Sequence, residues 1–197
     1  MNFCQLISRF CILIMTSFML TSPSVKAAAV ADNKLKSTAS ILIQEPDLHY
    51  SFAIPKDINW SYEIDQRPNA LGVLIHWTDP KSPIGIDITA LDEVFEEDNV
   101  RQVAKDSIEA IANRVGSTNA ITTKDLTRVV IGMLDGYSYQ LTGQINDKKY
   151  DFYIFIGSLN KPPHERRPIN ISVSTLNGEL KIHRAVIFRL LKSIKSL

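Results

Sequence analysis

Residues 136–158, GYSYQLTGQINDKKYDFYIFIGS, decide the fold class. Aromatic and aliphatic side chains alternate with polar ones on both sides of Asn146-Asp147-Lys148, which is the pattern of two β-strands joined by a tight turn. In the second arm, apolar residues occupy both faces near Tyr153 and Phe155. We therefore predict a β-hairpin whose second strand is central in a sheet and covered on both sides.

Further strands are predicted on either side of this hairpin, because apolar residues alternate or cluster between turn-forming residues. They are expected at residues 40–44, 50–54, 60–64, 70–78, 84–88, 126–134 and 170–175. The first is expected to be an edge strand. The turn that leads from 126–134 into the hairpin is placed at Asp135-Gly136.

Two helices are predicted, at residues 99–115 and 180–196. In the first, apolar residues recur every three or four positions, at Val100, Val103, Ala104, Ile108, Ile111 and Val115. Asp98 or Asn99 is expected to cap its start, and Gly116 to end it. The second helix has its apolar face at Ile187, Leu190, Leu191 and Ile194.

The order of these elements predicts an α+β fold. No run of strand–helix–strand units indicates a parallel sheet, and one sheet that is apolar on both faces needs a helix on each side. We predict an α/β/α sandwich, with a mainly antiparallel sheet covered by helices at about 99–115 and 180–196.

The first 31 residues are typical of a secretory signal peptide. Arg9 precedes an apolar run at residues 10–20, and a segment of small residues follows it. The run is shorter than the roughly 20 residues that span a bilayer. Cleavage is expected after Ala31 or after Ala27, and an uncleaved anchor is the alternative. The prediction is a periplasmic or secreted protein, with membrane contact only through this segment before cleavage.

The mature chain would contain no cysteine, since Cys4 and Cys11 both lie in the signal segment. Disulfides, thiol nucleophiles and thiolate metal sites are then excluded. Loss of Arg9 and Lys26 leaves 20 basic against 21 acidic residues. This balance does not favour nucleic acid as a partner.

The chain resembles the PsbP-like superfamily at several segments. Tyr50-Ser51-Phe52-Ala53-Ile54-Pro55, with Trp60 soon after, is similar to its F-x-I-P…W opening. The later matches are Gly136-Tyr137-Ser138-Tyr139, residues 150–158 and 171–175, and the closing Leu191-Lys192-Ser193-Ile194. In that superfamily, photosystem II PsbP proteins share an α/β/α sandwich with Ran-release factors and small bacterial periplasmic proteins. The resemblance implies a non-enzymatic accessory or binding role. The length of the mature chain predicts a single PsbP-like domain over residues 32–197, and the polar residues 32–39 are expected to be flexible.

The loop at residues 161–168, KPPHERRP, is the candidate partner-docking site. Its prolines reduce the entropy lost on docking, and the side chains expected to make contact are Lys161, His164, Arg166 and Arg167. A solvated connection between strands is the alternative. The partner would be an unknown envelope or secreted protein.

Other candidate chemistry has a structural alternative in each case. The acidic residues between Asp92 and Asp98 suit a cation, a basic partner or a helix start. Five aromatic residues suit a ligand pocket or a core: Trp60, Trp77, Tyr137, Tyr139 and Tyr153. The four histidines, His49, His76, His164 and His183, have no metal-ligand spacing, and the sequence lacks a nucleophile elbow, a P-loop and a dinucleotide-binding motif.

Three functions follow from these observations. The first is a non-enzymatic accessory or binding protein of the envelope, with no metal or cofactor. The second is a carrier of a small apolar or aromatic ligand. The third is a hydrolase with a dispersed site, which would bring His76, Asp79 and a serine together in one cleft.

Overall fold

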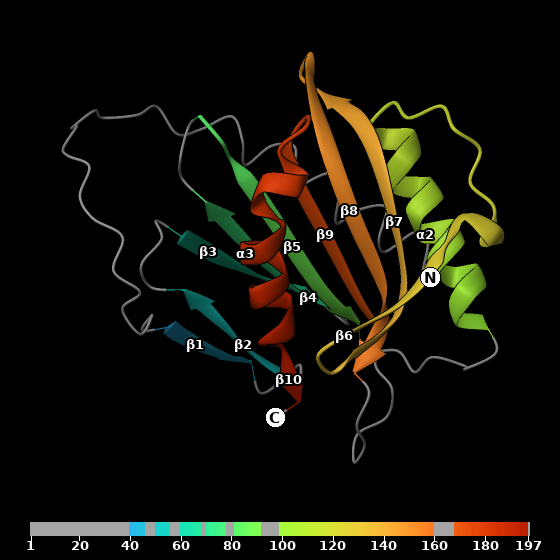
Figure 1. Ribbon diagram of the computed structural model, residues 1–197. Helices are drawn as coiled ribbons and strands as arrows, with labels where there is room; N and C mark the ends of the chain where they lie inside the picture. Colours follow the sequence, from blue (N-terminus) through green and yellow to red (C-terminus); the bar gives the residue numbers. More distant parts are fainter. Residues whose placement is uncertain are drawn as a thin grey trace.

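The larger sheet of the protein has seven strands in the order β3-β4-β5-β9-β8-β7-β6 (Figure 1). The computed structural model describes residues 40–45, 50–55, 60–67, 70–77, 81–91, 99–159 and 168–196. All neighbours in this sheet are antiparallel. The strands are β3 (Trp60–Arg67), β4 (Ala70–Trp77), β5 (Ile84–Leu91), β6 (Thr127–Ile131), β7 (Leu134–Ile145), β8 (Lys148–Leu159) and β9 (Pro168–Leu176).

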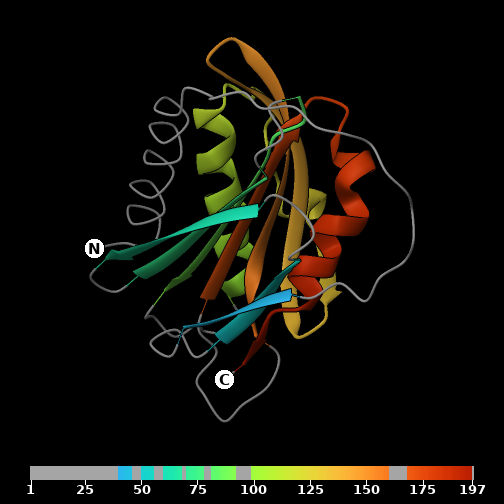
Figure 2. The same cartoon turned by 90° about the vertical axis from the view of Figure 1, so that its left-hand side faces the viewer.

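Two helices cover opposite faces of this sheet (Figure 2). Helix α2 (Val100–Arg114) packs on one face and α3 (Leu180–Lys192) on the other, and a short 3₁₀ turn, η3 (Thr123–Asp125), follows α2. Each helix joins its own hydrophobic core, because apolar residues from both sheet faces are buried against it. The α+β class and the mainly antiparallel sheet predicted from the sequence are confirmed.

Strand β8 is an interior strand of the sheet and is covered on both faces, as the hairpin pattern predicted. It lies between β9 and β7. Tyr153 and Phe155 are buried in the core beneath α3, whereas Phe152, Ile154 and Ile156 are buried beneath α2. Consecutive side chains of a strand point to opposite faces, so a strand with both faces apolar must be covered twice.

The hairpin turn has the backbone that its sequence favours. Asn146 and Asp147 both have positive φ, 48° and 63°, which matches the right-handed twist of the flanking strands. The other predicted turn, at Asp135-Gly136, was wrong. Those residues pair with Val130 and Val129 in the ladder, and the chain reverses before them at residues 132–133. Gly132 takes a φ of 62° there, so β7 begins at Leu134.

Helix α2 ends as predicted, at a glycine. Gly116 has a φ of 66°, and Ser117 N donates to Ala112 O at 2.9 Å, which completes a Schellman motif. Asn99 occupies the N-cap position but makes no capping hydrogen bond with its side chain. The other cap candidate, Asp98, lies outside the described residues.

A second, three-stranded sheet has the order β1-β2-β10, with strands β1 (Ser40–Glu45), β2 (Tyr50–Pro55) and β10 (Lys195–Ser196). The predicted helix at 180–196 was therefore too long. Ser193 ends it, because its Oγ donates to Leu190 O at 2.6 Å and accepts from Ala53 N at 2.8 Å. These bonds tie the end of α3 to β2.

Candidate functional site

The sheet face beneath α2 changes from apolar to polar between β8 and β9. The residues of β8 on this face are Phe152, Ile154 and Ile156, all buried. Their partners across the ladder on β9 are Ser174, Ser172 and Asn170. The partners of those residues on β5 are Gly85, Asp87 and Thr89.

We call six side chains of this half the polar strip: His76, Asp87, Thr89, Asn170, Ser172 and Ser174. His76 belongs to β4 and pairs with Gly85. Asp87 and Asn170 are each 7% exposed and Thr89 is 2% exposed. Thr89 Oγ1 donates to Asp87 Oδ1 at 3.3 Å, but Asn170 Oδ1 is buried with no hydrogen-bond partner. Three of the six are therefore buried polar residues, and the strip gives this half of the sheet face hydrogen-bonding groups where β8 has only apolar ones.

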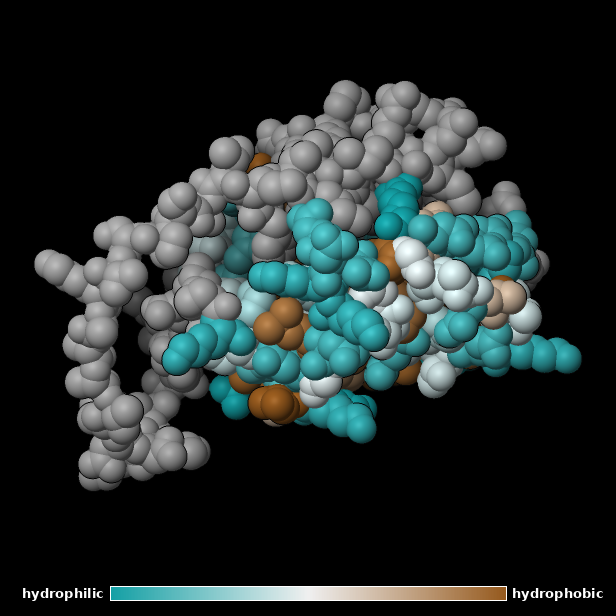
Figure 3. Space-filling view, turned by 90° about the horizontal axis from the view of Figure 1, so that it is seen from above, coloured by the Kyte–Doolittle hydropathy of each residue, from teal (hydrophilic) through white to brown (hydrophobic). Residues whose placement is uncertain are grey.

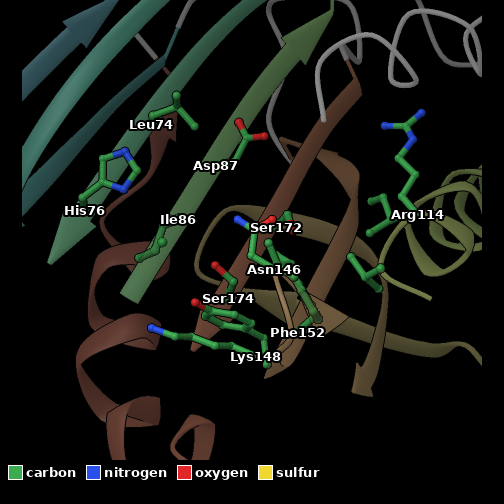
Figure 4. Close-up of a pocket in the computed structure, with 15 residues that line it drawn as sticks. Leu74, His76, Ile86, Asp87, Arg114, Asn146, Lys148, Phe152, Ser172 and Ser174 are labelled. Atoms are coloured by element: carbon green, nitrogen blue, oxygen red, sulfur yellow. The ribbon is translucent and has the colours of Figure 1, made fainter. Parts of the chain in front are cut away.

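A cavity of about 170 Å³ lies where the apolar and polar halves meet (Figure 4). The sheet contributes its floor through Leu74, His76, Gly85, Asp87, Ser172 and Ser174. The end of α2 contributes Ile111, Arg114 and Val115, and the β7–β8 hairpin contributes Ile145, Asn146, Lys148, Tyr150 and Phe152. The cavity is therefore apolar on the helix and hairpin side and polar on the strand side.

Gly85 leaves free volume above the floor of the cavity, because it has no side chain. It lies between His76 and Ser174 in one row across β4, β5 and β9. A Cβ at Gly85 would be 2.8 Å from Ser174 Oγ, so the serine hydroxyl occupies the space above this glycine. The hydroxyl can rotate, which makes the position tolerant of a methyl group that would reduce the free volume.

The wall formed by α2 and the hairpin is held by a close backbone contact. Gln144 N donates to Val115 O at 2.7 Å. The preceding residue of β7, Gly143, lies so close to the helix end that a Cβ there would be 2.6 Å from Val115 Cβ and 2.7 Å from Val115 O. The end of α2 therefore rests directly on β7, and the shape of the cavity depends on this contact.

The charged groups of the cavity are unequally distributed. Arg114 and Lys148 belong to the helix and hairpin wall, and Asp87 belongs to the floor. Burial lowers the pKa of His76 below its ordinary 6.5, although Glu63 acts in the opposite direction, so the imidazole is largely neutral at pH 7. Burial also raises the pKa of the Tyr150 phenol, which stays neutral. Among the lining residues that the structure describes, the two cations Arg114 and Lys148 exceed the acid Asp87 by one formal charge.

The predicted docking loop lies outside the described residues. This applies to Lys161, His164, Arg166 and Arg167, and also to the acidic run between Asp92 and Asp98. It applies as well to His49 and to Asp79, which the hydrolase hypothesis needs. These predictions stay untested.

The five aromatic candidates do not line the cavity. Trp60 and Trp77 pack against the α3-side core with ring centroids 5.6 Å apart. Tyr137 and Tyr139 pack on the α2-side core, and Tyr153 belongs to the α3 side. The sequence interpretation missed the cavity residues on β5 and β9, although the alternation of polar residues in GIDIT and NISVS contained the signal.

Ser82, His183 and Glu179 meet on the opposite side of the sheet. Ser82 Oγ donates to Glu179 Oε2 at 2.6 Å and lies 2.6 Å from His183 Nε2. Glu179 Oε2 is 3.8 Å from that same Nε2, whereas the acid of a catalytic triad holds Nδ1. The Trp77 ring also packs edge-on against the imidazole, with centroids 5.0 Å apart. This cluster ties the chain before β5 to the start of α3.

Within the described part of the chain, no three His, Cys, Asp or Glu side chains form a group suited to a metal ion. Among the same residues, no helix has the length and hydropathy needed to span a bilayer. The surface seen from above is mainly hydrophilic, with separated apolar patches (Figure 3). The large exposed apolar side chains are likewise distributed over several elements: Leu42, Tyr62, Ile64, Val130 and Ile182.

Comparison with known proteins gave no family and no curated relative: no family model and no curated protein matches the chain. Among solved structures, 11 chains match, and three of them are described here. A protein from Bacteroides thetaiotaomicron is 12% identical with a TM-score of 0.45, over 76% of this chain and 45% of that one. LpqN, described as involved in cell envelope biogenesis of Mycobacterium tuberculosis, is 12% identical with a TM-score of 0.47, over 81% of this chain and 91% of LpqN. The cyanobacterial PsbP (CyanoP) from Synechocystis is 8% identical with a TM-score of 0.43, over 85% and 98%.

This chain spans less than half of the Bacteroides protein. A PsbP protein is among the similar structures, and membership of that superfamily stays a prediction. At TM-scores below 0.5, none of these similarities assigns a function to the chain, so the cavity itself must carry that argument.

Proposed function

We propose that this is a non-enzymatic, exported binding protein that holds a small molecule in the cavity between α2, the β7–β8 hairpin and the polar strip. The observation that carries the proposal is the two-sided lining of this cavity. Ligand sites are typically concave and largely apolar, with a few polar groups that fix the orientation of the ligand. Here Phe152 and Val115 supply an apolar wall, and Ser172, Ser174 and His76 supply hydrogen-bonding groups opposite.

The size of the cavity limits the ligand to one ring or a short branched chain. A dry cavity of roughly 150 Å³ is known to hold benzene. At about 170 Å³, this cavity has room for a molecule of that size. The ligand envisaged in the sequence analysis, apolar or aromatic, fits the wall, and a polar group on its other side would suit the hydroxyls of Ser172 and Ser174 in the floor.

Native mass spectrometry of the chain purified from its source tests the proposal. We expect a bound small molecule that is lost when the protein is denatured. Gly85→Ala is the matched variant, because its methyl group enters the floor of the cavity while only the mobile Ser174 hydroxyl has to move. It should fold like the parent and lose the bound mass. A bare mass for the parent chain under native conditions would count against the proposal.

An accessory role beside an envelope protein is the second candidate. The sequence of the loop at 161–168 favours it, because prolines reduce the entropy cost of docking and arginines form bidentate contacts with carboxylates. A pull-down with the full chain and with an Arg166→Glu, Arg167→Glu variant tests this role. A partner retained by the parent and lost by the variant supports it, and equal capture by both argues against this loop.

A further inference from the structure

We propose that the ligand of this cavity is a small ring-sized monoanion, such as a cyclic or aromatic carboxylate, bound with its anionic group toward Lys148 and its ring against the wall that contains Phe152. This inference rests on the proposed function, since it specifies the ligand of the same site.

The excess positive charge of the lining is the first argument. Lys148 is exposed at the mouth of the cavity and makes no ion pair with any described residue. Figure 4 shows its side chain extended from the hairpin toward the β5 side of the cavity. An anion there would gain a charge-assisted hydrogen bond without displacing an existing partner of the lysine.

The acidic residue among the described lining residues, Asp87, lies in the floor of the cavity and not at its mouth. Asp87 is 7% exposed and already accepts from Thr89 Oγ1 at 3.3 Å. A cationic ligand would therefore have to reach a buried carboxylate in the floor that already accepts a hydrogen bond. Coulomb repulsion from Arg114 and Lys148 opposes that approach.

The apolar wall of the cavity is the reason for assigning a ring to the ligand. Val115, Ile145 and Phe152 face the same cavity as Arg114 and Lys148, and all belong to the α2 and hairpin side. A planar apolar body packed on them keeps its anionic group at the mouth and its other edge over the hydroxyls of Ser172 and Ser174. These hydroxyls can donate or accept, so they permit a further polar substituent on the ring.

Three probes of equal size and different charge test the assignment: benzoate, benzyl alcohol and benzylammonium. Calorimetric titration of the full chain should show benzoate binding about 10-fold more tightly than benzyl alcohol, with benzylammonium the weakest. Lys148→Met should weaken benzoate by about 3- to 10-fold and leave benzyl alcohol unchanged. Lys181→Met, an equal change of net charge on α3 across the sheet, should leave all three unchanged. The benzoate affinity of the parent should fall with added salt.

The outcomes separate this inference from the proposed function. If benzyl alcohol or benzylammonium binds as tightly as benzoate, and Gly85→Ala abolishes that binding, the anion assignment is overturned while the cavity stands as a site. If Lys148→Met and Lys181→Met have the same effect on benzoate, the role of Lys148 is overturned. If the parent binds none of the three probes, both the inference and the proposed function fail.

Discussion

Gly143→Ala should destabilise the protein by separating α2 from β7. The added Cβ would lie 2.6 Å from Val115 Cβ and 2.7 Å from Val115 O, where ordinary contacts are 3.4–4 Å. A backbone carbonyl cannot rotate away, so the strand or the helix end must move by several tenths of an ångström, which also strains the 2.7 Å bond from Gln144 N to Val115 O. Overpacking of this kind costs about 1–3 kcal/mol. The lower entropy of alanine in the unfolded chain offsets about 0.4–1 kcal/mol of this cost.

The net loss expected for Gly143→Ala is therefore about 1–2 kcal/mol, or a fall in Tm of roughly 2–8 °C for a chain of this size. Urea unfolding followed by circular dichroism measures the first quantity, and calorimetry the second. Gly85→Ala is the control, because only the Ser174 hydroxyl is close and it can rotate. Its free energy of unfolding should stay within about 0.5 kcal/mol of the parent. If Gly143→Ala is as stable as Gly85→Ala, the proposed contact between α2 and the hairpin is not present.

Three more predictions follow from single side chains. Phe155→Ala should lower the free energy of unfolding by about 3–5 kcal/mol in urea titration, because Phe155 is wholly buried in the central strand; an effect below 1 kcal/mol would contradict its place there. Ser82→Ala should cost about 1–2 kcal/mol in the same assay, since it removes the hydroxyl shared by Glu179 and His183; a neutral result would mean that this tie does not hold α3. His76 has a lowered pKa in the folded state, so its stabilising contribution is complete above pH 6.5 and is lost as the pH falls toward the folded value. Thermal melts from pH 7.5 to pH 5 should therefore show a smaller loss of stability for His76→Gln than for the parent, and identical pH profiles would argue against burial of this imidazole.

Local pattern determined what the sequence could predict. The alternation in residues 136–158 located the hairpin and the double burial of β8, because side-chain direction in a strand has a fixed period of two. The helix stop at Gly116 was equally predictable, because a positive φ of this kind favours glycine. The end of α3 at Ser193 was not predictable from local sequence. Ser193 Oγ accepts a hydrogen bond there from Ala53 N, which is 140 positions away in the chain.

The candidate site could be predicted only in part, for the same reason. Polar residues alternate in β5 and β9, but nothing local shows that these strands are neighbours or that β8 lies next to them. Only this order places Gly85 beside Ser174 and brings both near Val115 and Lys148. The aromatic residues that the sequence offered as a pocket lining pack instead in or against the two hydrophobic cores.

The position of a bound ligand tests the account most directly. Amide chemical shifts of the ¹⁵N-labelled chain can be followed during titration with benzoate. We predict that the largest changes fall on Gly85, Val115, Asn146 and Ser174, which surround the cavity on three sides. Changes concentrated instead at the smaller hollow beneath α3, around Leu180, Arg184 and Phe188, would contradict it.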